Sequence, residues 1–162
     1  MDVNRFTEKA REALSSAQTL AVRERHTELD VEHVLTSLLE QEQGLALSIL
    51  TKAQANVESL VGRLKGTLDH LPRLSGPEGA SQQTYMSGRL NLLLERAEVE
   101  AGKLHDEYVS VEHLLFSMTD DDGTTGRLFK EIGITKEKLM SALLDVRGNQ
   151  RVTSQNPEAT YE

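Results

Sequence analysis

Apolar residues recur at spacings of three and four along most of the chain, as they do on the buried face of amphipathic α-helices. The first such stripe extends from Phe6 to Ala21. It predicts a helix over residues 4–25 with Asn4 as its N-cap, because a short polar side chain there satisfies a free N–H of the first turn. The chain is therefore expected to begin with an amphipathic helix.

Three further helical stretches follow in the first half of the chain. Asp30 is placed to cap a second helix, which Gly44 is expected to end, since glycine readily takes the conformation that closes a helix. A short helix is expected over residues 46–53, and Asn56 caps a stretch that keeps helical spacing up to residue 71. The first half therefore predicts four helices.

The pattern of the first half occurs again about eighty residues later. The motif VEHVL at residues 31–35 returns as VEHLL at residues 111–115. Repeat one is placed at residues 4–71 and repeat two at residues 84–147, joined by a connection rich in proline and glycine at residues 72–83. Other matched pairs are Asn4 and Thr84, Thr7 and Ser87, Leu14 and Leu94, and Asp30 and Ser110.

This repetition predicts the fold class. One four-helix unit has an apolar face to cover, and a second copy packed against it would share a single core. The sequence therefore predicts an all-α fold in which two pseudo-twofold-related four-helix repeats pack into one globular domain.

Composition narrows the classes of function. The 162 residues include 18 basic and 26 acidic side chains, a formal net charge of -8, which argues against a surface that follows nucleic-acid phosphates. No apolar run is long enough to span a membrane, and the opening MDVNRFTEK lacks the apolar stretch of a signal peptide. We therefore expect a cytoplasmic domain that binds neither nucleic acid nor membranes.

Catalytic and metal-binding motifs are missing from the sequence. Cysteine is absent, and neither His33 nor His113 has a second histidine one turn away, so a packed or capping histidine is expected at both positions. The stretch GTTGR at residues 123–127 lacks the spacing and the lysine of a phosphate loop and is interpreted as a polar loop. We expect no catalytic residue, no metal site and no nucleotide binding in this chain.

The two glutamates of the repeated motif have an ordinary structural explanation. Glu32 and Glu112 each fall in the first turn of a predicted helix, where the helix dipole favours a negative charge. The repeats differ just before the motif, since Asp106 stands where repeat one has His26. The acidic pair therefore occurs only in repeat two, and a site built on it would be single.

The sequence resembles a known family of chaperone domains. Phe6 and Thr7 at the start of the first helix, the VEHVL and VEHLL motifs and the Leu-Pro pair at residues 71–72 are similar to the Clp N domain, and the resemblance covers residues 1–147. That domain precedes the AAA+ rings of Clp-family unfoldases. The tail at residues 148–162 resembles the start of the connector to the first AAA+ domain, absent here, in the disaggregase branch of the family.

The resemblance implies a domain that binds unfolded or aggregated polypeptide and passes it to the AAA+ rings. The parent protein would be a hexamer using ATP and magnesium, acting with the DnaK chaperone system in the stress response; the isolated domain would be a monomer without a cofactor. Three polar positions match the family pattern and are candidates for substrate binding, namely Thr7, Asp106 and Glu112. Each also has a structural explanation, as a first-turn hydroxyl, a turn former and a helix-dipole acid.

Apolar residues near these positions complete the candidate site. A twofold-like pairing would bring the first helix of repeat one close to the second helix of repeat two, so Phe6, Leu94 and Leu114 are placed to line a groove for hydrophobic client segments. We expect weak binding, with dissociation constants of roughly tens of micromolar, because an unfolded client loses entropy when it binds. The alternative is docking of folded adaptor proteins, as in the protease-associated branch of the family.

Overall fold

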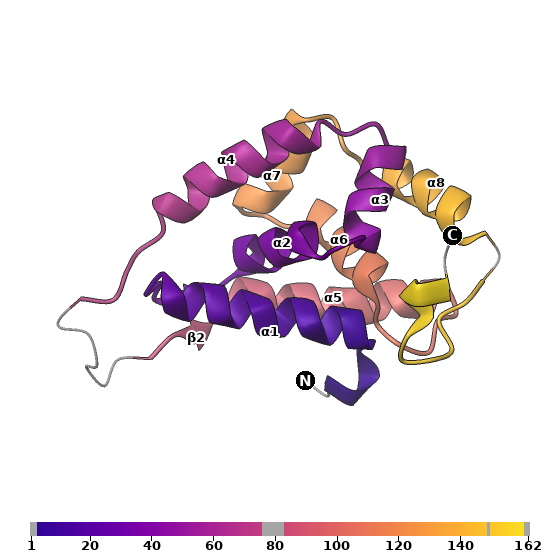
Figure 1. Cartoon of the computed structure of the whole chain (residues 1–162), viewed down its shortest axis with the longest axis horizontal. Coiled ribbons are helices and arrows are strands. Elements are labelled where there is room, and N and C mark those ends of the chain that lie inside the picture. The colour runs from indigo at the N-terminus through magenta and orange to yellow at the C-terminus, as the bar shows by residue number, and fades with distance from the viewer. Residues whose placement is uncertain (1–2, 76–82, 149, 161–162) are drawn as a thin grey trace.

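The computed structural model describes residues 3–75, 83–148 and 150–160, which form an almost entirely helical molecule (Figure 1). The predicted fold class is confirmed. Repeat one contains α1 (Glu8–Arg23), α2 (Val31–Glu40), α3 (Leu45–Lys52) and α4 (Val57–Asp69). Repeat two contains α5 (Gly88–Lys103), α6 (Val111–Thr119), α7 (Thr124–Glu131) and α8 (Lys136–Arg147). Short 3-10 helices lie at Val3–Arg5 and Pro157–Thr160, and two-residue strands are β1 (Glu28–Leu29) and β2 (Tyr85–Met86).

The first helix of each repeat begins later than the sequence pattern predicts. Thr7, not Asn4, is the N-cap of α1, since its hydroxyl oxygen accepts a hydrogen bond from Ala10 N at 3.2 Å. Ser87, not Thr84, caps α5 in the same way. Residues just ahead of these caps do not join the helices because they pair with the other repeat.

Backbone pairing links the two repeats. Strands β1 and β2 run parallel, with Leu29 opposite Met86, and Phe6 forms a parallel bridge with Val109. In each pair, a residue ahead of the first helix of one repeat lies beside a residue ahead of the second helix of the other. The repeats are therefore interlocked in the pseudo-twofold manner that the sequence predicts.

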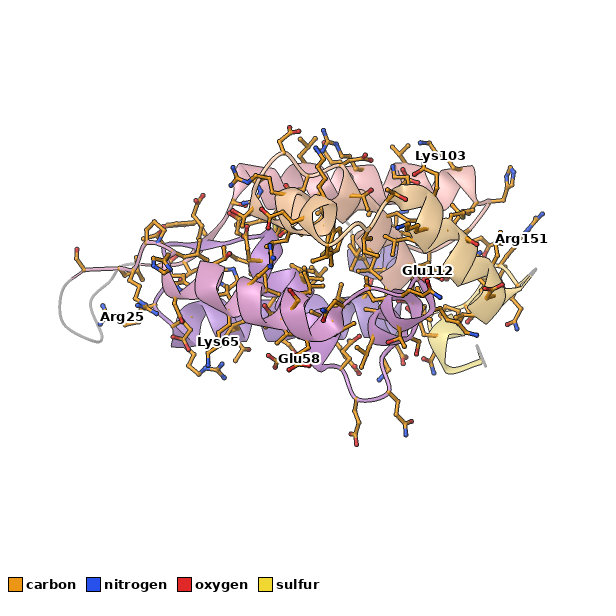
Figure 2. All side chains as sticks on the ribbon, turned by 90° about the horizontal axis from the view of Figure 1, so that it is seen from above. Arg25, Glu58, Lys65, Lys103, Glu112 and Arg151 are labelled. Atoms are coloured by element: carbon orange, nitrogen blue, oxygen red, sulfur yellow. The ribbon has the colours of Figure 1, made fainter. Side chains whose placement is uncertain are left out.

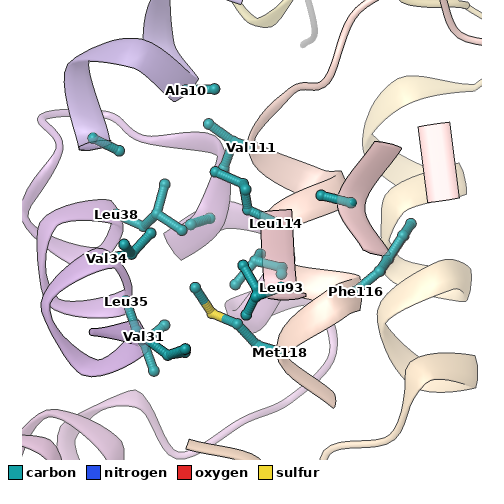
Figure 3. Packing of buried hydrophobic residues seen from close by; sticks show 14 of the residues in the cluster. Ala10, Val31, Val34, Leu35, Leu38, Leu93, Val111, Leu114, Phe116 and Met118 are labelled. Atoms are coloured by element: carbon teal, nitrogen blue, oxygen red, sulfur yellow. The ribbon is translucent and has the colours of Figure 1, made fainter. Parts of the chain in front are cut away.

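One hydrophobic core serves both repeats. Helix α1 packs on α2 and α5 on α6, while α3 contacts α8 and α4 contacts α7 across the repeats. Figure 3 shows Val34 and Leu38 of α2 facing Leu114 and Met118 of α6. Each repeat therefore buries its apolar face against the other. Most of the predicted connection, residues 76–82, lies outside the described residues.

Two further boundaries differ from the sequence-based expectation. Helix α2 ends at Glu40, and Gly44 is the N-cap of α3 rather than the end of α2. The stretch GTTGR is not a loop, because Gly123 caps α7 and the next four residues are helical. A Cβ added to Gly126 would lie 1.9 Å from the Asp121 carbonyl oxygen, so this close packing requires glycine. None of the helices within the described ranges is long and apolar enough to cross a membrane.

Candidate functional site

Helices α1 and α6 begin side by side because the residues ahead of them are paired. Thr7 N donates to Val109 O at 2.9 Å, and Val109 N donates to Arg5 O at 2.8 Å. The positive ends of the two helix dipoles therefore lie close together. We call the surface formed by Thr7, Asp106 and Val111 the seam.

A buried polar network supports the seam. Ser110 N donates to His113 Nδ1 at 2.8 Å, so the proton of the neutral ring is on Nε2, which donates to Asp106 Oδ2 at 2.7 Å. Arg147, the last residue of α8, pairs with Asp106 and, at 3.4 Å, with Glu112. The Ser110 hydroxyl also donates to Glu112. One guanidinium and one imidazole therefore hold two buried carboxyl groups.

Burial and pairing shift the acidity of these two carboxyls in opposite directions. Burial alone would raise the pKa of Asp106, but hydrogen bonds from His113 and Arg147 outweigh it and hold this pKa below its usual range. Burial raises the pKa of Glu112, and the negative charge of Glu158 adds to the increase. As the pH falls, Glu112 therefore takes up a proton before Asp106.

A stretch near the end of the chain packs on the seam. Glu107 N donates to Val152 O at 2.7 Å, and Val152 N donates to Asp106 Oδ1 at 2.9 Å. The Val152 side chain is fully buried. Residues 150–158, which we call the C-terminal segment, therefore fold back onto the domain.

The second half of the C-terminal segment lies at the start of α1 and α6. Glu8 N donates to Gln155 O at 2.7 Å. The Thr7 hydroxyl donates to Glu158 Oε2 at 2.7 Å, and Val111 N donates to the same oxygen at 3.4 Å. Donors from both helix N-termini therefore converge on one oxygen of the Glu158 carboxylate. The other oxygen is buried and has no hydrogen-bond partner in the part of the chain that the structure describes.

A cleft of about 1130 Å³ adjoins Glu158 and reaches between α3 and α8. Its lining includes Leu47, which is 37% exposed, and the charged side chains Lys52 and Asp145. Val111, at the start of α6, lines it as well. The seam therefore adjoins a larger surface that carries apolar and charged groups.

The structure brings together the three polar residues singled out from the sequence. Thr7 and Glu112 are fully buried, and Asp106 is 9% exposed. Figure 2 shows Glu112 within the body of the molecule, whereas Arg151 of the C-terminal segment points outward. The three residues therefore lie buried beneath the seam and do not form a charged rim around it.

The three apolar candidates lie in the hydrophobic core. Phe6 and Leu114 are fully buried, and Leu94 is 1% exposed. In this conformation they offer no surface to a ligand. Their contact with a client stays a prediction.

Sequence reasoning missed three residues of the seam, Arg147, Val152 and Glu158. Arg147 could have been found from the sequence. The matching position of repeat one is Leu68. A charged residue at a position that faces the core requires a partner. Val152 and Glu158 lie beyond the last helical pattern, where spacing carries no signal for a segment that folds back.

Repeat one has different chemistry at the matching place. His33 Nε2 and His26 Nδ1 lie 2.8 Å apart, and Asp30 N donates to His33 Nδ1 at 2.9 Å. Burial lowers the pKa of both histidines, that of His33 to about 4. This pair is therefore neutral near pH 7. Across the described ranges, no cluster of three or more His, Asp or Glu side chains is arranged to hold a metal ion.

The guanidinium of Arg89, on α5, balances the negative charges of Asp30 and Glu32 in repeat one. It donates to Glu32 at 2.6 Å, to Asp121 at 2.8 and 2.9 Å, and to Asp30 at 3.2 Å. Burial alone would lower the pKa of Arg89, but these hydrogen bonds outweigh it and raise the pKa. Burial also raises the pKa of Glu32, although the hydrogen bond and the charge of Arg89 act to lower it. This arginine of repeat two thus holds two acids of repeat one, Asp30 and Glu32, and one of its own repeat, Asp121.

Sequence comparison places this architecture among known proteins. A family profile described as the Clp repeat (R) N-terminal domain matches residues 5–132. The chaperone protein ClpB of Bacillus cereus is 46% identical over 162 residues, which cover 100% of this chain and 19% of that protein. The chain therefore spans about a fifth of the length of the curated relatives it matches.

Structural comparison gives the same answer for the fold. The Hsp104 N-terminal domain from Candida albicans superposes with a TM-score of 0.80 at 20% identity, covering 94% of this chain and 98% of that one. The ClpV N-domain in complex with a VipB peptide gives a TM-score of 0.70 at 19% identity, covering 88% and 86%. Together with the sequence matches, these similarities confirm the resemblance stated from the motifs.

Proposed function

Because the chain belongs to the Clp repeat (R) N-terminal domain family, we propose that it is the substrate-receiving domain of a disaggregase-type chaperone. It binds unfolded or aggregated polypeptide at the seam and passes it to the AAA+ rings of the parent protein. The domain itself takes no part in catalysis. The parent is a hexamer that uses ATP and magnesium and acts with the DnaK system in the cytoplasm.

The observation that supports this proposal most directly is the polypeptide that already lies on the seam. The C-terminal segment is held there through its backbone, by Glu107 N on Val152 O and by Glu8 N on Gln155 O. Backbone contacts of this kind do not depend on the side chains of the ligand. A surface that binds in this way suits a chaperone with many different clients.

Each candidate polar residue has a role in this proposal. Asp106 accepts a hydrogen bond from a backbone N–H of the bound segment, as it does from Val152 N. Thr7 donates its hydroxyl proton to a ligand oxygen. Glu112 acts through Arg147, which it helps to hold beneath the seam.

The apolar part of the proposed site is the cleft beside Glu158, where Leu47 is exposed. A hydrophobic client segment gains free energy when it covers such surface. Phe6, Leu94 and Leu114 reach a client only when the helices part. The affinity stays low, with dissociation constants of roughly tens of micromolar, because an unfolded client loses entropy on binding.

Fluorescence anisotropy of a labelled, permanently unfolded protein, titrated with the full chain, tests the proposal. We expect saturable binding to the wild type and binding at least about fivefold weaker to Thr7→Val, which removes one charge-assisted hydrogen bond. Ser87→Ala removes the matching hydroxyl at the start of α5 in repeat two, away from the seam, and should leave binding unchanged. Equal loss in both variants, or the same affinity for the folded form of the client, would overturn the proposal.

The second candidate function is docking of a folded adaptor. It is favoured by an apolar pocket of about 390 Å³ between α1, α2 and α4, lined by Leu20, Leu39, Val61 and Leu64. This pocket lies in repeat one, away from the seam. A substitution such as Val61→Lys that abolished binding of a folded partner and left client binding intact would support it.

A further inference from the structure

We propose that the seam selects polypeptide segments that carry a carboxylate, and that Glu158 is its built-in occupant, which a client must displace. This inference rests on the proposed function and names the chemical class of ligand. The ligand is a segment with a small branched apolar residue and, six residues later, a glutamate or aspartate. Val152 and Glu158 present these two groups within the chain itself.

The first support is the set of donors around the Glu158 carboxylate. The Thr7 hydroxyl oxygen accepts from Ala10 N at 3.2 Å, so its own proton is available and goes to Glu158 at 2.7 Å. Val111 N is a free donor of the first turn of α6 and points to the same oxygen. A hydroxyl and a helix N-terminus together favour an anion at this place.

The second support comes independently from the matching place, where the start of α5 in repeat two meets the start of α2 in repeat one. There, the Ser87 hydroxyl donates to Asp30 Oδ1 at 2.7 Å, and Val31 N donates to the same oxygen at 2.8 Å. Ser87 and Val31 are the repeat mates of the two donors around Glu158. This place is therefore filled permanently by Asp30, the N-cap of α2.

The seam cannot be filled in that way. Ser110 stands where repeat one has Asp30, and its hydroxyl donates to Glu112 instead. The fold thus keeps the donors for a carboxylate at both places, but only the seam leaves them to an acid that arrives from elsewhere in the chain.

The contacts of the C-terminal segment make it displaceable. Its buried parts are Val152 and Pro157, whereas residues 153–156 are exposed. The Glu158 carboxylate also lies near the buried Glu112, whose charge opposes it. A segment with few buried contacts opens at low free-energy cost.

The test uses two labelled peptides, blocked at both ends, with the sequence of residues 150–158. One carries the natural glutamate at its last position and the other carries glutamine. They are titrated against the full chain with the substitution Glu158→Gln, which weakens the tethered copy. We expect the glutamate peptide to bind about fivefold tighter than the glutamine peptide, the factor that an anion gains at a helix N-terminus.

Three variants sharpen the result, with circular dichroism to verify that each is folded. The wild-type chain should bind the glutamate peptide up to about fivefold more weakly than Glu158→Gln does, because the tethered glutamate competes at high effective concentration. Adding Thr7→Val should abolish the preference for glutamate, and Thr7→Ser should retain it. Adding Ser87→Ala, the matched change at the start of α5 in repeat two, should leave it intact. Equal affinity for both peptides, or equal affinity of wild type and Glu158→Gln, would overturn the inference.

Competition with an unlabelled, permanently unfolded protein separates this inference from the proposed function. If that protein displaces the glutamate peptide, both stand. A peptide preference without displacement keeps the carboxylate site and refutes client binding at the seam. Client binding without a peptide preference refutes the carboxylate site and leaves the proposed function standing.

Discussion

The two copies of the VEH motif occupy matching places in the fold, but the charges around their histidines differ. In repeat one, His33 faces His26, and burial keeps both neutral. In repeat two, His113 faces an ionised Asp106, which is also paired with Arg147. One matched pair of positions therefore holds two neutral rings in one repeat and an ionic network in the other.

This difference explains how a duplicated fold has one candidate site. The donors at the helix starts are kept in both repeats, through Thr7 and Ser87. Asp30 accepts the Ser87 hydroxyl, whereas the Thr7 hydroxyl is left to Glu158. Duplication thus supplies the architecture, and a few buried substitutions decide which copy binds a segment.

The largest effect is expected when Arg147 is replaced by leucine, the residue that repeat one has at the matching position. The change leaves Asp106 and Glu112 buried without their cation, so the free energy of unfolding should fall by about 3–5 kcal/mol. Urea denaturation measures this loss. The double variant with Asp106→His copies repeat one further and should recover part of it. A loss below about 1 kcal/mol in the single variant would refute the account of the network.

The next effect is a pH dependence that belongs to repeat one. The pKa of His33 in the fold, about 4, lies below its value in an unfolded chain, about 6.5. Stability is therefore full above pH 6.5 and falls as the pH drops from 6.5 through 4, by at most about 3 kcal/mol. The contribution of Asp106, whose pKa is lowered, is lost only at still lower pH. A nuclear magnetic resonance titration in which the His33 ring has its midpoint near 6.5 would contradict this.

A smaller effect is expected for Arg89→Leu. Arg89 is 28% exposed in its side chain, so water partly compensates the acids that it leaves. We expect a loss of about 2 kcal/mol, the range of hydrogen bonds to charged groups. Thermal unfolding at neutral pH compares it with Arg147→Leu, and a greater loss for Arg89→Leu would reverse our ranking of the two networks.

The smallest effect should come from the two caps. Thr7→Val and Ser87→Ala each remove an N-cap hydroxyl, which should cost about 1 kcal/mol. Only Thr7→Val also removes a contact with the C-terminal segment. Hydrogen exchange at Val152 N should therefore become faster in Thr7→Val and stay unchanged in Ser87→Ala. Equal acceleration in both would show that the segment does not depend on Thr7.

Helical spacing and the repeated motif were enough to predict helices α1 to α8 and their pseudo-twofold pairing, because the helices follow from local periodicity and the pairing follows from the repetition. The start of α1 was misplaced, since the pairing of Phe6 with Val109 joins residues far apart in sequence. Thr7, Asp106 and Glu112 were grouped correctly in space. Their burial was not foreseen, because it depends on Arg147 and the C-terminal segment, which no periodic pattern connects to them.

The central claim is that polypeptide binds at the seam, where α1 and α6 begin, and not at the matching place, where α5 and α2 begin. Amide chemical shifts of the labelled full chain, recorded during titration with a permanently unfolded protein, test it directly. We predict shifts at Glu8, Glu107 and Val111, while their repeat mates Gly88, Thr27 and Val31 stay still. Equal shifts at both sets of amides, or shifts confined to Gly88, Thr27 and Val31, would contradict the account.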